Sequence, residues 1–212
     1  MTDPVFPDLK GRSVFITGGG AGIGAALTEA FLRQGAKVAF CQRSDATPFC
    51  DVMERATGNR PLFLPCDIAV TDQLQLTLAT AAKAQGPITV LVNNAANDQR
   101  HDTLKTDQAF WDWSIDVNLR SYFFACQSVI PGMQAAGGGS IINFSSISFM
   151  MADTGYAAYI TANAGIIGLT RTLAREFGPD RIRVNAIAPG WVLTDRQKQL
   201  WVTPDALASH LA

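Results

Sequence analysis

The sequence predicts an α/β protein built around one doubly wound parallel sheet. Short apolar runs rich in Val, Ile and Phe alternate with longer runs of helical periodicity, which is typical of parallel βαβ units. A glycine-rich turn directly follows the first apolar run and precedes the first helix. Because 212 residues are enough to bury a substantial core, we expect one domain over 1–212.

Six strands are expected, and each is a short apolar run bounded by turn or helix signals. They lie at 13–17, 37–41, 62–64, 89–92, 140–144 and 182–187. Crossovers between parallel strands of one sheet are right-handed, and such sheets bind ligands at the carboxyl ends of the strands, where the winding reverses. We therefore expect the functional residues just after the strands.

The helices between these strands are expected from their periodicity and stop signals. In the first helix, Ile23, Leu27 and Phe31 recur at helical spacing, and Gly35 ends it. The other helices are expected over 46–58, 71–85, 107–135 and 156–177. The segment 191–212 has no readable pattern.

The charge balance and the cysteines exclude several kinds of partner. Lys plus Arg (17) nearly equal Asp plus Glu (18), so we expect no basic surface for nucleic acid or an anionic membrane. Residues 1–8 lack the features of a signal peptide, and no later stretch is apolar for long enough to span a bilayer, so we expect a cytoplasmic protein. Without paired spacing, the cysteines predict no metal site and are expected as isolated small core residues; they are Cys41, Cys50, Cys66 and Cys126.

The turn over 17–24 reads Thr-Gly-Gly-Gly-Ala-Gly-Ile-Gly. Glycines let the backbone approach a pyrophosphate, and the following helix N-terminus presents free N–H groups to it. The G-x-G-x-x-G spacing of many dinucleotide sites is absent, so an ordinary tight turn is the alternative interpretation. Its place between strand and helix favours a dinucleotide site, with contacts from Thr17, Gly18, Gly20, Gly22, Ile23 and Gly24.

Further motifs resemble the short-chain dehydrogenase/reductase family in order and spacing, over nearly the whole chain. They are Asn93-Asn94-Ala95, Asn118, Ser146, Tyr159 and Pro189-Gly190, taken with the glycine turn. The resemblance implies a Rossmann-like fold that binds NAD or NADP. It also implies cofactor contacts from Asp67, Ile68, Asn93, Ala95, Pro189, Gly190, Val192 and Thr194.

The same resemblance implies Tyr159 as acid/base, Ser146 as the residue that steadies the substrate oxygen, and Asn118 as the residue that orders the site. A free phenol has a pKa of about 10, and a nearby cation lowers it. In the family, a lysine one helical turn after the tyrosine supplies this charge and holds the nicotinamide ribose. This chain has Asn163 there, and an amide can still contact the ribose but carries no charge.

Two functions stay open because of Asn163. The first is an NAD(P)-dependent oxidoreductase that transfers hydride between the nicotinamide and a secondary alcohol or a sugar hemiacetal, with turnover weakened by the missing charge. The second is a dinucleotide-binding protein with little or no turnover, acting as a sensor or as an inactive partner in an oligomer. Arg171, two turns after Asn163, is one candidate replacement for the charge.

The choice between NAD and NADP depends on the end of the second strand. An acidic residue there binds the ribose of NAD and repels the 2′-phosphate of NADP, whereas arginine attracts that phosphate. The chain has Gln42 and then Arg43, which favours NADP. Asp45 lies close by, and Ala21 leaves the glycine turn without a basic residue, so NAD stays open.

Two stretches, 93–101 and 189–197, are similar to those of bacterial aldose 1-dehydrogenases, which oxidise sugars to lactones. A polyhydroxylated substrate is bound by several polar side chains at the pocket mouth, and Asn97, Arg100 and Trp191 are suitable candidates. Asp98 and His101 are of suitable type as well. The alternative is that Asp98, Arg100 and His101 are ordinary exposed loop residues.

Members of the resembled family usually continue with further helices and a last strand, whereas this chain stops at Ala212. We expect that this C-terminal substrate-loop region is absent. Either this sequence is part of a longer protein, or the protein is short and its pocket is open on one side. The resemblance implies a homodimer or homotetramer formed through 107–135 and 156–177. Trp111 and Trp113 are expected in the core or at that interface.

Overall fold

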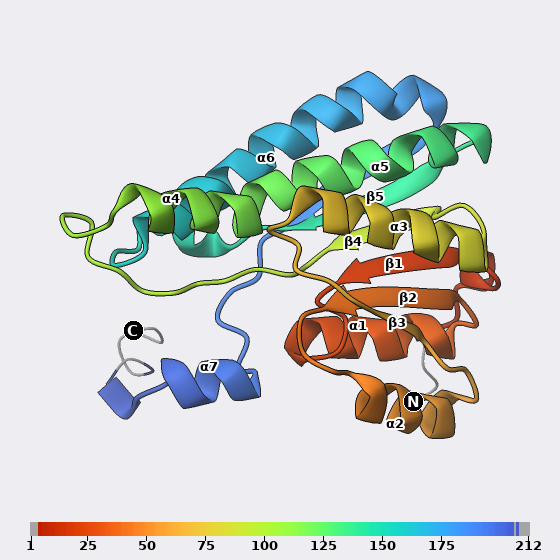
Figure 1. Cartoon of the computed structure of the whole chain (residues 1–212), viewed down its shortest axis with the longest axis horizontal. Helices are drawn as coiled ribbons and strands as arrows, with labels where there is room; N and C mark the ends of the chain where they lie inside the picture. Colours follow the sequence, from red (N-terminus) through yellow and green to blue (C-terminus); the bar gives the residue numbers. More distant parts are fainter. Residues whose placement is uncertain (1–3, 206, 208–212) are drawn as a thin grey trace.

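Six parallel strands form one sheet in the computed structural model, which describes residues 4–205 and 207 (Figure 1). The strands are β1 (Ser13–Thr17), β2 (Lys37–Gln42), β3 (Leu62–Pro65), β4 (Val90–Asn93), β5 (Gly139–Phe144) and β6 (Ile182–Ile187). Their order is β3-β2-β1-β4-β5-β6, and all pairs are parallel. The predicted doubly wound sheet is confirmed, and its winding reverses between β1 and β4.

Helices cover the two faces of this sheet (Figure 1). They are α1 (Gly22–Arg33), α2 (Thr47–Thr57), α3 (Thr71–Gln85), α4 (Gln108–Ile115), α5 (Ser121–Ala135), α6 (Ala157–Phe177) and α7 (Asp195–Leu200). α3, α5 and α6 share one buried core with the sheet residues Phe15, Leu91 and Ile141. α1 and α2 share a second core with Val14 and Phe40, on the opposite face. Near-continuous apolar strands such as β1, buried along its whole length, are what a sheet covered on both faces requires.

The single helix predicted over 107–135 is wrong in one respect, because a π-helical turn, Asp116–Arg120, separates α4 from α5. Asn118 lies in this turn, and its side-chain nitrogen donates to the carbonyl of Ser114, 2.9 Å away. A side chain that satisfies the carbonyl one turn back competes with the regular backbone ladder, and π-turns of this kind are frequent at functional sites. The helix expected from residue 156 begins at Ala157.

Buried polar side chains tie the middle of the sheet to α6. Asn93 on β4 donates to Asn143 on β5 at 2.9 Å, and Asn143 donates to Thr170 on α6 at 3.0 Å. All three residues are buried, so each bond replaces a lost bond to water. This ladder fixes α6, which carries the candidate catalytic residues, against the sheet.

All four cysteines are buried, as expected of core residues. Their expected isolation is wrong for one pair, because the thiols of Cys41 and Cys66 interact where β2 and β3 end and line the same cavity. In residues 4–205 and 207, no helix is long and apolar enough to cross a membrane, and no three potential metal ligands cluster. Residues 1–3, 206 and 208–212 of the domain expected over 1–212 lie outside the described residues.

Candidate active site

The candidate site lies at the carboxyl edge of the sheet, where the winding reverses between β1 and β4. Four segments meet there: the glycine turn after β1, the loop after β4, the loop after β5 and the segment after β6. This is where the sequence predicted the functional residues, and it is the usual binding position in such sheets.

The glycine turn is packed so tightly that side chains are excluded from it. A Cβ atom on Gly24 would lie 1.9 Å from the carbonyl oxygen of Gly18, and one on Gly20 would lie 2.4 Å from the Gln42 side chain. Gly18 has a φ of 71°, which favours glycine. No side chain caps the start of α1, so the first-turn N–H groups, including those of Gly22 and Ile23, stay available to an anion. This cradle fits a pyrophosphate.

Thr17 and Asn94 hold the turn against the end of β4. The Thr17 hydroxyl accepts hydrogen bonds from the backbone N–H groups of Asn94 and Ala95, both at 3.0 Å. The Asn94 side chain donates to the Thr17 carbonyl, also at 3.0 Å. Asn93, which was expected to contact the cofactor, instead directs its side chain to Asn143 inside the protein. The Asn93 side chain is thus engaged inside the sheet, while its neighbour Asn94 braces the turn.

A cavity of about 130 Å³ opens beside this turn. It is lined by Gly18, Cys41, Gln42, Arg43, Cys66, Asp67, Ile68, Ala95, Ala96, Asn97, Trp113 and Val117. The cavity thus brings together six of the predicted cofactor residues, from the ends of β1, β2, β3 and β4. The two thiols and Trp113 are lining residues that the sequence did not indicate, because only the sheet order makes them neighbours.

Arg43, directly after β2, places a cation in the lining of the cavity. Gln42 accepts from the backbone N–H of Gly20 at 3.1 Å and donates to the carbonyl of Ser44 at 3.1 Å, so its amide closes the turn. Asp45 accepts from the N–H and the hydroxyl of Thr47, and these bonds hold the pKa of Asp45 below its usual value. Asp45 is therefore engaged at the start of α2. No ion pair of the described residues includes Arg43.

Asn118 fixes the loop after β4. Its side-chain oxygen accepts from the backbone N–H of Asn97 at 2.7 Å, and its nitrogen donates to the carbonyl of Asn97 at 3.0 Å. Because Asn118 is 1% exposed, these bonds are shielded from water. The predicted ordering role of Asn118 thus has a structural counterpart, which is the positioning of this loop by the π-turn.

The side chains of Tyr159 and Ser146 lie close enough to interact, and this interaction lowers the pKa of the phenol. Burial is the largest influence and raises the pKa of Tyr159, while the side chains of Ser146 and Asn163 lower it in part. Asn163 is buried, and its side-chain nitrogen also donates to the backbone carbonyl of Tyr159 at 2.9 Å. At neutral pH the phenol is therefore protonated, and an uncharged amide stands beside it.

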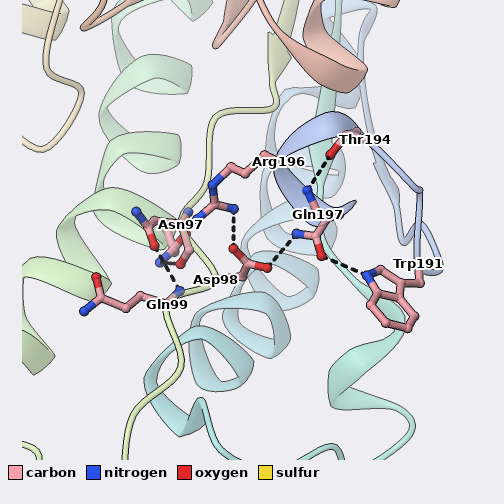
Figure 2. A network of polar contacts seen from close by, with 8 residues as sticks. Asn97, Asp98, Gln99, Trp191, Thr194, Arg196 and Gln197 are labelled. Atoms are coloured by element: carbon pink, nitrogen blue, oxygen red, sulfur yellow. Dashed lines mark hydrogen bonds and ion pairs between the residues drawn. The ribbon is translucent and has the colours of Figure 1, made fainter. Parts of the chain in front are cut away.

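A polar network joins the loop after β4 to α7 (Figure 2). Asp98 accepts hydrogen bonds from Arg196 and from Gln197, the second at 2.7 Å. Gln197 in turn accepts from the indole N–H of Trp191 at 2.8 Å. Burial raises the pKa of Asp98, but the bonds from Gln197 and Arg196 outweigh it and hold the pKa below its usual value. α7 is thereby fixed over the site.

The other predicted residues after β6 lie along the approach to α7. The carbonyl of Pro189 accepts from Ile147 at 3.2 Å, which joins this segment to the loop that carries Ser146. A Cβ atom on Gly22 would lie 3.2 Å from the methyl group of Thr194, so this segment faces the glycine turn. Gly190 and Val192 lie between these two contacts, and Val192 is exposed.

The remaining polar residues of the loop after β4 have distinct environments. Asn97 accepts from the N–H of Gln99 at 2.9 Å. The ring nitrogen Nε2 of His101 accepts from the backbone N–H of Ala158 at 3.3 Å, so His101 satisfies the first turn of α6. The Arg100 guanidinium lies over the ring of Tyr156, 3.5 Å from its centre. The alternative that Asp98, Arg100 and His101 are ordinary exposed loop residues is wrong for all three, because each makes a defined contact.

Comparisons with known proteins identify relatives along nearly the whole chain. A family model described as short chain dehydrogenase matches residues 12–205. A probable galactose dehydrogenase from Rhizobium meliloti (strain 1021) is 49% identical over 205 residues, which cover 96% of this chain and 80% of the relative. A D-xylose 1-dehydrogenase from Caulobacter vibrioides (strain NA1000 / CB15N) is 45% identical over 213 residues, covering 100% of this chain and 84% of the relative.

Solved structures share the fold. A candidate short-chain alcohol dehydrogenase from Sinorhizobium meliloti 1021 superposes with a TM-score of 0.89 at 31% identity, covering 94% of this chain and 80% of that chain. An L-sorbose reductase from Gluconobacter frateurii, in complex with NADPH and L-sorbose, has a TM-score of 0.86 at 27% identity, covering 90% and 73%. These structures therefore support the fold of this chain.

Proposed function

The chain belongs to the short-chain dehydrogenase/reductase family, whose members are oxidoreductases acting on CH–OH groups with NAD or NADP, and from this premise we propose that it oxidises the hemiacetal of an aldose to a lactone. The observation that carries the proposal is the neighbouring pair of Tyr159 and Ser146, whose side chains interact beside a loop fixed by Asn118. Two relatives that are at least 45% identical are named for sugar oxidation, which supports an aldose as substrate.

The proposed reaction removes a hydride from the anomeric carbon and a proton from its hydroxyl group. A bound nicotinamide supplies the hydride acceptor. Tyr159 takes the proton of the anomeric hydroxyl, so that the O–H and C–H bonds break as the lactone carbonyl forms. Ser146 hydrogen-bonds the same oxygen, and Asn118 acts through the loop by keeping Asn97 in place.

Pyrophosphate binding is assigned to the cradle at 18–24, and adenine to the cavity that contains Asp67, Ile68 and Ala95. We assign the nicotinamide end to Pro189, Gly190, Val192 and Thr194, which lead from the Ser146 loop toward the glycine turn.

NADP is the proposed preference. Arg43 at the rim has no ion pair among the described residues, whereas Asp45 is occupied by Thr47. A guanidinium with no carboxylate partner is suited to a ribose phosphate.

A dinucleotide-binding protein without turnover is the second candidate, and Asn163 is the observation that favours it. The two are separated by titrating NAD and NADP calorimetrically and by assaying the unaltered chain, Asn163→Lys and Tyr159→Phe against aldoses and simple secondary alcohols. We expect NADP to bind more tightly, the unaltered chain to oxidise aldoses, and Asn163→Lys to raise kcat/KM at pH 7 about tenfold, which corresponds to a pKa change of about one.

Each other outcome has a distinct meaning. Tight dinucleotide binding with turnover only in Asn163→Lys supports the second candidate. Activity retained in Tyr159→Phe contradicts the role of Tyr159, and absence of dinucleotide binding contradicts both functions.

A further inference from the structure

Oxidation by Tyr159 needs a positive charge near its phenol, and Asn163 does not supply one. Arg171, the candidate from the sequence, is exposed and lies twelve residues after Tyr159 on α6, a rise of about 18 Å along the helix. Its charge is therefore distant and screened by solvent. A closer cation comes from the loop after β4.

Two ring contacts link Arg100 to the two tyrosines of α6. Its carbon Cζ lies 3.5 Å from the centre of the Tyr156 ring. The rings of Tyr156 and Tyr159 are themselves stacked, with centres 5.5 Å apart and planes inclined by 16°. Because the two contacts share the Tyr156 ring, the Arg100 charge lies within about 9 Å of the Tyr159 ring.

The charge of Arg100 is not neutralised by an ion pair within the part of the chain that the structure describes. The Trp201 ring lies on the guanidinium as well, 5.2 Å from Cζ. The nitrogen Nη1 is buried and has no hydrogen-bond partner among the described residues. Aromatic faces hold a guanidinium without cancelling its charge, so its field extends into the site.

The other groups that face Tyr159 do not supply this charge. Ser146 and Asn163 are neutral, and Tyr122 on α5 is buried with a raised pKa, so it is neutral too. Asp98 raises the pKa of the phenol more than Arg100 lowers it, although the Asp98 charge is paired with Arg196. Asp153 is a further carboxylate beside the stack, since it accepts a hydrogen bond from the Tyr156 hydroxyl at 2.8 Å. Arg100 is thus the unpaired cation that faces Tyr159 among the described residues.

We propose that Arg100 takes over the electrostatic role of the absent lysine and promotes ionisation of Tyr159 across the ring of Tyr156. Arg100 is then a positioning residue, because it acts on the substrate through Tyr159. A unit charge at about 9 Å and an effective dielectric constant of about 20 is enough to change the tyrosinate fraction about tenfold. The expected effect of Arg100 on turnover rests on the proposed function. The expected effect of Arg100 on Tyr159 ionisation does not.

The first test follows Tyr159 ionisation without turnover. Tyrosinate absorbance near 295 nm is titrated against pH in the unaltered chain, Arg100→Lys and Arg100→Gln, each paired with its Tyr159→Phe counterpart so that the difference reports Tyr159 alone. We expect Arg100→Gln to raise the pKa of Tyr159 and Arg100→Lys to leave it nearly unchanged. Equal values in all three proteins would overturn the proposal.

The second test is the pH profile of aldose oxidation. Arg100→Gln is expected to move the rising limb of kcat/KM upward by about one pH unit and to lower kcat/KM about tenfold at pH 7, with the same plateau at high pH. A purely structural loss would lower the plateau and leave the limb in place, which contradicts the proposal. Adding Asn163→Lys to Arg100→Gln should return the limb toward its original position.

Two controls keep the outcomes separate. If circular dichroism shows that Arg100→Gln is not folded, Arg100→Met replaces it, because its apolar stem still fills the space between the two rings. If no variant oxidises any aldose but the absorbance titration still depends on the charge at residue 100, the proposed substrate fails and the inference about Arg100 stands. If the chain oxidises an aldose but the rising limb of the pH profile does not depend on the charge at residue 100, the proposed function stands and the inference about Arg100 fails.

Discussion

At the residue scale, the candidate cofactor site depends on the absence of side chains in the glycine turn. Gly24 stands where the first turn of α1 passes the carbonyl of Gly18, and the 1.9 Å approach of a Cβ atom would force the turn to open. Opening the turn moves the free N–H groups of α1 away from the position of a pyrophosphate. This turn is therefore expected to bind through backbone N–H groups, and an added side chain would displace them.

Gly24→Ala should weaken NADP binding at least about tenfold and lower stability, because the added methyl group meets backbone that cannot rotate away. Calorimetric titration and thermal unfolding measure both effects. Gly168→Ala on α6 is the matched control, since nothing lies within 4 Å of its Cβ position, and it should stabilise the helix by about 0.5–1 kcal/mol. Equal NADP affinity in the two variants would count against the cradle.

At the element scale, α7 depends on one carboxylate from a distant loop. Asp98 is 98 residues from Arg196 in sequence, yet it bonds both Arg196 and Gln197 (Figure 2). The helix has only six residues and no buried ones, so packing contributes little to its position. The polar network therefore determines whether α7 covers the site.

Asp98→Asn should release α7 and raise the KM for an aldose several-fold, because the charge-assisted bond to Arg196 is lost. Tryptic cleavage after Arg196 and Lys198 should become several-fold faster. Asp195→Asn is the control, as its carboxylate is 95% exposed and lies 3.9 Å from Lys198. Unchanged cleavage in Asp98→Asn would show that other contacts hold α7.

The same network predicts a pH dependence in the unaltered chain. The pKa of Asp98 is lower in the folded protein than in the unfolded chain, so its stabilisation is fully present above the ordinary aspartate pKa of about 3.9. It is lost as the pH falls through the folded value. Hydrogen exchange of α7 should therefore show constant protection from pH 7 to about pH 5 and a loss below about pH 4, absent in Asp98→Asn.

At the scale of the whole molecule, two cores pack on opposite faces of one sheet. The outer surface of α4 and α5 carries exposed aromatic side chains. Phe123 on α5 is 43% exposed and Trp111 on α4 is 40% exposed. These rings belong to the helical region through which the sequence predicts a homodimer or homotetramer. Large exposed aromatic residues are enriched at such interfaces.

Phe123→Glu should shift the chain toward monomer, because a buried interfacial carboxylate without a partner is strongly unfavourable. Light scattering coupled to size exclusion measures the mass directly. Val52→Glu on α2, 47% exposed on the opposite face, is the control and should keep the original mass. A monomeric unaltered chain would contradict the predicted oligomer.

The sequence by itself determined the strands, their alternation with helices and the glycine turn, because periodicity and turn chemistry are local properties. Family motifs with fixed spacing also pointed to Asn118, Ser146 and Tyr159, and their roles stay predictions. Strand ends were correct to within one residue.

Tertiary structure alone decided the contacts between distant segments. The π-turn at Asn118 arises because its side chain must reach both Ser114 and the loop after β4, which helical periodicity does not encode. The stack of Arg100 on Tyr156 and the bond of Asp98 to α7 likewise join segments that are far apart in sequence. Such contacts are set by how the sheet brings loops together at one edge, so no local pattern could indicate which charge faces Tyr159.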